Sequence, residues 1–197
     1  MPPVNRHMIV SICGNIGSGK STVVKGLGEV GYVVHQEPVS EMTTLLNNFY
    51  TDMKKWAFHL QVQVLVLYAK MLPHLAGSMH VVERSPLESK NIFENLLVDD
   101  GTMEYDEHVL YNELYDHIGW EPDHIIYLDA NPDVCMRRIR KRDRPEEGNI
   151  SSTYIKQLHD RYLRIKHFRN THVIDANDNP DIVLKRVVET LNSLQNV

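Results

Sequence analysis

Five short apolar runs recur along the chain, and longer segments with helical periodicity separate them. The runs are Met8–Cys13, Tyr32–Gln36, His80–Glu83, His124–Leu128 and His172–Asp175. Buried strands that alternate with helices are typical of an α/β sandwich built on a parallel sheet. The carboxyl ends of parallel strands meet at one edge of such a sheet, and ligands bind there. The pattern therefore predicts a five-stranded parallel sheet with helices on both faces and a site at that edge.

The sequence pattern predicts helices over three long segments. The segment Trp56–Leu75 is apolar nearly all round, and helices of this kind are buried in a core or in an interface. It is therefore either a central core helix or a packing surface between two copies of the chain. A second helix is expected over Ser151–Phe168, with Ser151 and Ser152 as candidate caps, and a third over Asp181–Gln195, which carries one apolar stripe.

The turn after the first apolar run carries the most specific motif. Residues 14–21 match the phosphate-binding loop G-x-x-x-x-G-K-[ST] at every fixed position, after a predicted strand and before a predicted helix. Backbone N–H groups and the helix N-terminus would bind phosphate, Lys20 would reach the β- and γ-phosphates, and Ser21 would hold Mg²⁺. A chance glycine-rich turn is the alternative. The residues expected to contact a nucleoside triphosphate are Gly14, Asn15, Ile16, Gly17, Ser18, Gly19, Lys20, Ser21 and Thr22.

Charged residues end two other predicted strands. Glu37 follows the second apolar run, where a carboxylate can accept a proton from a hydroxyl that attacks a phosphate; a helix cap is the alternative. Glu83 and Arg84 end the third run, and neighbouring side chains on a strand point to opposite faces. One can then face a metal ion while the other faces the acceptor, unless the two form a simple ion pair. The guanidinium of Arg84 is a rigid donor fork, suited to holding a carboxylate or steadying a hydroxyl.

A basic run lies between the fourth and fifth predicted strands. Residues 137–144 contain six cations and pass into Pro145, Glu146, Glu147 and Gly148. Arginines supplied by a closing flap stabilise the charge on a transferred phosphoryl group. Residues 138–150 are therefore interpreted as a lid. A solvated face or a nucleic-acid patch is the alternative, and the acidic balance of the chain opposes a nucleic-acid patch.

Composition narrows the class of protein. A length of 197 residues fits a single domain over 1–197, and a formal net charge of −5 argues against a nucleic-acid binder. Two cysteines are too few for a disulfide framework, and the eleven histidines show no metal-ligand spacing. The start, Met1–His7, does not read as a signal peptide, and Trp56–Leu75 is too polar for a membrane span. We expect an intracellular, cytoplasmic protein that binds neither membrane nor nucleic acid.

One face of the apolar helix carries Gln61, Val64 and Tyr68. A buried amide needs hydrogen-bond partners, which the edge of a nucleobase can supply. The alternative partner for the Gln61 amide is nearby backbone, and the glutamine taken alone favours this alternative.

With these residues in place, the chain resembles the deoxyribonucleoside kinase family from about Ile9 to about Asp178. The motifs occur in order: Gly-Asn-Ile-x-x-Gly-Lys-Ser, Glu-Pro-Val, a tyrosine followed eleven residues later by glutamine, Glu-Arg-Ser, and Arg-x-Arg-x-Glu-Glu. The resemblance implies a three-layer nucleotide-kinase sandwich with an arginine-rich lid. It also implies ATP- and Mg²⁺-dependent phosphorylation of deoxyribonucleosides for nucleotide salvage, and a homodimer built on helices that include 56–75.

The resemblance further implies roles for single residues. Glu37 would be the general base for the sugar 5′-hydroxyl, and Arg84 would steady that hydroxyl. Glu83 and Ser21 would lie near Mg²⁺. The implied catalytic residues are Lys20, Glu37, Arg84, Arg142 and Arg144; the implied nucleoside contacts are Glu37, Tyr50, Gln61, Val64, Tyr68, Arg84, Ser89, Phe93 and Glu147; and the implied adenine contacts are Arg138, Asp175, Ala176 and Asn177.

Within the nucleoside contacts, Tyr50 and Glu147 would hold the 3′-hydroxyl, Gln61 would pair with the base edge, and Phe93 would stack on the base. Relatives that favour deoxycytidine and purines carry aspartate where this chain has Ser89. A small residue there leaves room for the thymine methyl group, and Tyr68 would exclude purines. We therefore expect pyrimidines as substrates, thymidine first and deoxycytidine next, and a gain of purine activity in Tyr68→Ala.

The chain also departs from the family pattern. Met42 stands where the family has tryptophan, and the stretch from Glu37 to Tyr50 is short. Both departures lie beside the expected nucleoside pocket and affect its shape, because methionine is flexible enough to reshape a wall.

Other classes of protein remain open. A nucleoside monophosphate kinase of the thymidylate kinase type needs extra cations for its phosphate acceptor and no base, so Glu37 beside Arg84 fits a hydroxyl acceptor better. A non-catalytic GTP-reading module would carry Asn-Lys-x-Asp, which the sequence lacks. A nucleic-acid-dependent ATPase would interleave aromatic residues with its cations.

Overall fold

The computed structural model describes residues 8–144, 147–148 and 150–195. The segment Met1–His7 and three positions of the expected lid lie outside the described residues. The strands are β1 (Met8–Cys13), β2 (Val33–His35), β3 (Met79–Glu83), β4 (His124–Asp129) and β5 (Thr171–Asp175). They form one sheet in the order β2-β3-β1-β4-β5 with every neighbouring pair parallel, which confirms the expected sheet.

The strand order places β1 at the centre of the sheet. Ile12 of β1 stands in register with Glu83 of β3, and Cys13 stands in register with Tyr127 of β4. The amide of Arg84 continues this pairing and donates to the carbonyl oxygen of Ile12 at 3.1 Å. The loop that follows β1 therefore begins beside the ends of both neighbouring strands.

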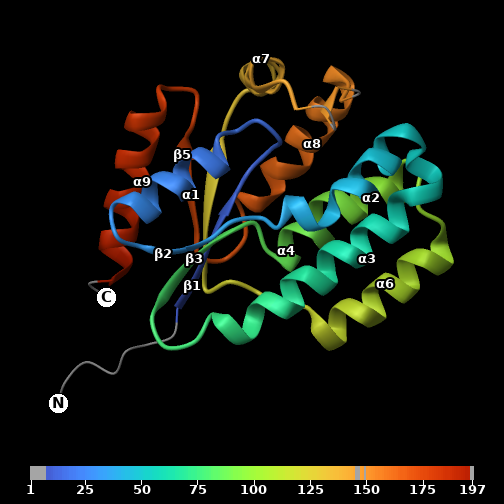
Figure 1. Cartoon of the computed structure of the whole chain (residues 1–197), viewed down its shortest axis with the longest axis horizontal. Coiled ribbons are helices and arrows are strands. Elements are labelled where there is room, and N and C mark those ends of the chain that lie inside the picture. The colour runs from blue at the N-terminus through green and yellow to red at the C-terminus, as the bar shows by residue number, and fades with distance from the viewer. Residues whose placement is uncertain (1–7, 145–146, 149, 196–197) are drawn as a thin grey trace.

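Helices cover both faces of the sheet. Figure 1 shows α1 and α9 on one face and α3, α6 and α8 on the other. The helices are α1 (Lys20–Glu29), α2 (Val39–Thr51), α3 (Met53–Met71), α4 (Pro86–Glu88), α5 (Asn95–Asp99), α6 (Tyr105–Ile118), α7 (Pro132–Arg142), α8 (Ser152–Ile165) and α9 (Pro180–Gln195). A 3₁₀ turn, η1 (Leu72–His74), follows α3, and a π-helical segment, η2 (Ser89–Glu94), joins α4 to α5.

The three expected helices form with shifted ends. α3 begins before Trp56, because the carboxylate of Asp52 accepts from the amide of Lys55 at 3.2 Å and caps the helix. It ends at Met71, where the chain tightens into η1. Of the two candidate caps of α8, Ser151 is the one that forms, since its hydroxyl accepts from the amide of Tyr154 at 3.0 Å.

The apolar surface of α3 packs against neighbours on several sides. Leu60 belongs to a cluster with α2, Leu65 to a cluster with α6, and Tyr68 to a cluster with Trp120 before β4. Three separate clusters use different sides of one helix, so burial within this chain explains why α3 is apolar nearly all round. In the part of the chain that the structure describes, no helix is long and apolar enough to cross a membrane.

A histidine pair joins each edge strand to its inner neighbour. Ring nitrogens of His35 in β2 and His80 in β3 lie 2.9 Å apart, and those of His124 in β4 and His172 in β5 lie 3.3 Å apart. Burial, and then the neighbouring His80, lower the pKa of His35; burial and His124 lower that of His172. A hydrogen bond between two imidazoles requires one ring to accept, so at least one member stays neutral.

We expect the free energy of unfolding to fall between about pH 7.5 and about pH 5.5. The folded state lowers the pKa of His35 and His172 below 6.5, so the unfolded chain binds more protons in this window. This contribution to stability is present above pH 6.5 and is lost as the pH falls through the lowered pKa values. Urea titrations at the two pH values measure the change.

Replacing His35 and His172 with glutamine should flatten this pH dependence. His117→Gln is the control, because His117 is exposed and lies outside both pairs. An unchanged slope in the double variant would contradict the assignment to the histidine pairs.

Candidate active site

The predicted phosphate loop joins β1 to α1 and is built closely around its lysine. The ammonium of Lys20 donates to the carbonyl oxygens of Gly14 at 2.7 Å and Asn15 at 2.8 Å. Gly17 has φ +80°, and a Cβ there would lie 2.6 Å from the carbonyl oxygen of Cys135 in α7. Glycine is therefore required at this position by both conformation and space.

Asn15, Ser18 and Lys20 are buried polar residues of the loop. Burial, and then the charge of Arg84, lower the pKa of Lys20 to about 8, so the ammonium remains largely charged at neutral pH. The amide of Asn15 donates to the carbonyl oxygen of Ile155 at 2.8 Å, and its Oδ1 accepts from the Ile16 amide at 2.8 Å. Asn15 thus attaches the loop to the first turns of α8. Thr22, in the first turn of α1, is exposed.

Ser21 and Glu83 form a hydrogen-bonded pair at the end of the phosphate loop. The hydroxyl of Ser21 donates to Oε1 of Glu83 at 2.6 Å, and Glu83 is buried. Across residues 8–144, 147–148 and 150–195, no group of three or more metal-ligating side chains gathers. Mg²⁺ is often held by one or two protein oxygens and takes its other ligands from phosphate and water. The hydroxyl and carboxylate of this pair fit that requirement.

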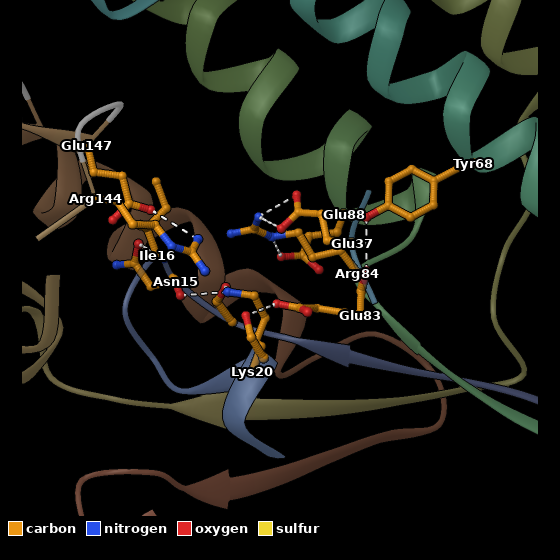
Figure 2. Close-up of polar contacts among 12 residues, drawn as sticks. Asn15, Ile16, Lys20, Glu37, Tyr68, Glu83, Arg84, Glu88, Arg144 and Glu147 are labelled. Carbon is orange, nitrogen blue, oxygen red and sulfur yellow. Dashed lines mark hydrogen bonds and ion pairs between the residues drawn. The ribbon is translucent and has the colours of Figure 1, made fainter. Parts of the chain in front are cut away.

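A partly buried ion pair lies across from the loop. Nη1 of Arg84 donates to Glu37 Oε1 at 2.7 Å and Oε2 at 2.6 Å, and the two side chains are 11% and 12% exposed. Burial opposes the charge of Arg84, but Glu37 and other neighbouring groups raise its pKa well above the usual value. Arg84 has φ +63°, a left-handed conformation that costs a non-glycine residue energy. Figure 2 shows the guanidinium between two carboxylates, those of Glu37 and Glu88.

These groups open into one cavity between the sheet edge and helices α2 and α3. Its lining includes many of the predicted site residues: Ile16, Ser21, Glu37, Tyr50, Gln61, Val64, Glu83, Arg84, Ser89, Phe93, Arg142, Arg144 and Glu147. The structure thus brings most of the predicted catalytic, metal and nucleoside residues to a common space, while Lys20 and Tyr68 are not among its lining residues.

Other lining residues were not assigned from the sequence. Four of them form one face of α2 with helical spacing: Val39, Met42, Leu46 and Phe49. This i, i+3, i+7, i+10 pattern is a signal that could have located the wall. Met42 had been noted only as a departure from the family pattern. Leu60 and Tyr154 also line the cavity, and no local motif marks Tyr154.

Gln61 is placed as a polar group in an apolar wall. It is 5% exposed, and its Oε1 has no hydrogen-bond partner among the described residues. The alternative that nearby backbone satisfies the amide oxygen is therefore not supported. An unpaired buried acceptor is costly, so this oxygen is available for a donor on a bound molecule.

The expectation for Tyr68 needs correction. Tyr68 is buried and does not belong to the described residues that line the cavity. Its hydroxyl donates to the carbonyl oxygen of Glu83 at 3.0 Å, as Figure 2 shows, and its ring packs edge-on against Trp120. Helical spacing puts it on the same side of α3 as Gln61, but its hydroxyl is directed at the β3 backbone. The structure therefore gives no support for exclusion of purines by Tyr68.

The basic run forms the end of α7 and the start of the expected lid. Arg142 donates through Nε and Nη2 to the two carboxylate oxygens of Glu147, at 2.7 Å and 2.5 Å. Arg144 lies 3.7 Å from Glu147 Oε1. These three residues bring a compact set of charges to the cavity wall.

A second arginine of α7 connects two loops. Arg138 donates to the carbonyl oxygens of Ser18 at 2.9 Å and Asp178 at 3.0 Å. Asn177 accepts from the amide of Asn131 at 2.8 Å and donates to Asp175 at 2.7 Å, while Ala176 is buried. Arg138 therefore holds the loop after β5 beside the phosphate loop.

Comparisons with known proteins agree with this geometry. The family model for deoxynucleoside kinase matches residues 10–194. The chain is 31% identical to the deoxyadenosine/deoxycytidine kinase of Bacillus subtilis over 167 residues, covering 81% of this chain and 76% of the relative. It is 32% identical to human mitochondrial thymidine kinase 2 over 166 residues, covering 78% of this chain and 62% of the relative.

A solved structure of deoxyadenosine kinase from M. mycoides gives a TM-score of 0.84 at 27% identity, and covers 95% of this chain and 100% of that one. The fold and family expected from the sequence are both confirmed. A kinase of this family acts on deoxynucleosides, which sets aside the monophosphate kinase and the non-catalytic module. The chain belongs to the deoxynucleoside kinase family.

Proposed function

We propose that this kinase transfers the γ-phosphoryl group of ATP to the 5′-hydroxyl of a deoxyribonucleoside, with Glu37 as the general base. The observation that carries the proposal is the Glu37–Arg84 pair, which lies in the wall of the cavity that also contains Gln61 and Ser21. A hydroxyl acceptor needs a base within hydrogen-bond reach. A carboxylate has about four lone-pair positions, so contact with Nη1 leaves others for the hydroxyl.

The donor side uses the phosphate loop and the lid. The loop amides and Lys20 bind the β- and γ-phosphates, and Arg142 and Arg144 stabilise charge on the transferred group. Ser21 and Glu83 would hold Mg²⁺, which neutralises phosphate charge when it is bound. Arg138 and the loop from Asp175 to Asn177 contact the adenine; their contacts with Ser18, Asp178 and Asn131 support this role.

The acceptor is proposed to be a pyrimidine deoxyribonucleoside, thymidine first and deoxycytidine next. Ser89 is buried and lines the cavity, and its small side chain leaves space beside the base. The free Oε1 of Gln61 meets the base edge, Phe93 stacks on the base, and Tyr50 and Glu147 hold the 3′-hydroxyl. The two relatives are named for different nucleosides, so their names do not select the base. The choice of base therefore rests on the residues of this pocket.

A homodimer built on helices that include α3 remains part of the proposal, and we add α6 to that surface. The outer face of α6 exposes the apolar side chains of Val109 and Leu110, and Tyr105 at its start is 75% exposed. Packing of a second copy there would remove this apolar surface from water.

Glu37→Gln should lower kcat by about 10²- to 10⁴-fold, because the amide cannot accept the proton of the 5′-hydroxyl. Binding of ATP and thymidine should persist, since glutamine keeps the size of the side chain. Release of ADP in the presence of thymidine measures turnover, and calorimetry measures binding. Near-normal turnover in this variant would remove Glu37 from the role of base.

Ser89→Asp should reduce kcat/KM for thymidine relative to deoxycytidine by about 10- to 200-fold, the range that one methylene-sized contact supports. The carboxylate fills the space proposed for the thymine methyl group and can accept from the amino group of cytosine. Ser89→Ala is the matched control and should preserve the preference. Tyr68→Phe, which lies outside the cavity lining, should also preserve it. An unchanged ratio in Ser89→Asp would contradict the proposed pocket.

A further inference from the structure

A second carboxylate contacts Arg84 and has no role in the function proposed above. Glu88 is the last residue of α4, four residues after Arg84, and is 2% exposed. Its Oε1 accepts from Nε of Arg84 at 3.1 Å and from the hydroxyl of Tyr162 in α8. Its Oε2 finds no partner among the described residues. Burying a carboxylate costs free energy unless its contacts compensate that cost.

We propose that Glu88 is a positioning residue, which fixes the guanidinium of Arg84 in the orientation that presents Nη1 to Glu37, while Tyr162 fixes Glu88. This inference rests on the proposed roles of Glu37 and Arg84.

The geometry of the guanidinium carries the argument. The group is planar and rigid, so fixing the direction of its Nε–H also fixes the direction of its Nη1–H bonds. Glu88 holds the Nε edge and Glu37 holds Nη1, as Figure 2 shows. The ring of Phe93 covers the planar face, with Cζ of Arg84 5.0 Å from the ring centroid. Two edges and one face of the Arg84 guanidinium are therefore restrained.

The backbone of Arg84 adds a reason for this restraint. Its φ of +63° is sparsely populated by residues with a side chain, so the contacts of the side chain must help to hold it. Without Glu88, the Nε–H would be buried without an acceptor. The guanidinium could then turn and present its Nε edge to Glu37, at the expense of its contact with the nucleoside hydroxyl.

Tyr162 fixes the other side of Glu88. It is fully buried, and its ring stacks on Tyr127 with a centroid distance of 5.8 Å and an interplanar angle of 5°. A ring held by stacking presents its hydroxyl in one direction. The core therefore extends through Tyr162 and Glu88 to the guanidinium of Arg84.

Two variants of Glu88 test the proposal. Glu88→Met keeps the length of the side chain but removes the acceptor, and it should lower kcat by up to about 10²-fold, the loss that a displacement of about 1 Å can cause. KM for thymidine should change by less than about threefold, because the loss lies in the transition state. Glu88→Gln keeps an acceptor oxygen and should restore most of kcat. Equal losses in the two variants, or normal kcat in Glu88→Met, would overturn the proposal.

Glu94→Met is the matched control for the loss of a buried carboxylate. Glu94 in η2 is 0% exposed and contacts His108 at 2.5 Å, but no contact joins it to Arg84 among the residues described. Thermal unfolding should show loss of stability in both methionine variants, while kcat should fall in Glu88→Met alone. An equal fall of kcat in Glu94→Met would assign the effect of Glu88 to general destabilisation.

A double-mutant cycle with Arg84→Lys tests whether Glu88 acts through Arg84. Glu88→Met should change kcat by less than about twofold in the Arg84→Lys background, because coupled residues are non-additive. Multiplicative losses would overturn the proposal.

Tyr162→Phe, made in the otherwise unchanged protein, should also lower kcat, by a smaller factor than Glu88→Met. Glu37→Gln, assayed in parallel, separates the two hypotheses: full activity there contradicts the proposed base, whereas its loss together with normal activity in Glu88→Met contradicts only the role of Glu88.

Discussion

The position of β1 between β3 and β4 is the constraint on which the site depends. It brings the phosphate loop beside the residues that follow β3, so Lys20, Glu83 and Arg84 become neighbours although they are distant in the sequence. Each of these charges is largely removed from water, and buried charges persist when they are paired. Hydrogen bonds satisfy each of them: Lys20 donates to carbonyl oxygens of the phosphate loop, Glu83 accepts from Ser21, and Arg84 donates to Glu37 and Glu88. The cavity can therefore be both polar and enclosed. The hydrophobic sheet sets the positions of these charges, and their hydrogen bonds offset the cost of burying them.

Most of the fold could be predicted because its signals are local. The five apolar runs correspond to the five strands, and the phosphate loop is a contiguous motif whose chemistry requires its glycines. The cap at Ser151 is likewise a local interaction. These predictions need only the residues within each motif and those next to it. The ordered motifs after β1, β2 and β3 also located the cavity residues Glu37, Gln61 and Arg84.

The rest depended on contacts between distant segments. Tyr68 has the correct helical spacing for a pocket residue, but spacing does not reveal that its hydroxyl bonds to the Glu83 backbone. No local motif marks Glu88 in the sequence, and its contact with Tyr162 joins two segments that are distant along the chain. The apolar α3 left a core helix and an interface open, since periodicity does not say whether a neighbour belongs to the same chain.

The left-handed backbone of Arg84 also bears on the evolution of this protein. Glycine would relieve the conformational cost at that position, yet it would remove the guanidinium that Glu37 and Glu88 both contact. Selection for stability and selection for turnover thus point to different amino acids at one position. The hydrophobic core must supply enough surplus stability to tolerate this conflict. Variants with a weakened core far from the cavity would leave less of that reserve, and the active site would then limit how many such changes the chain can accumulate.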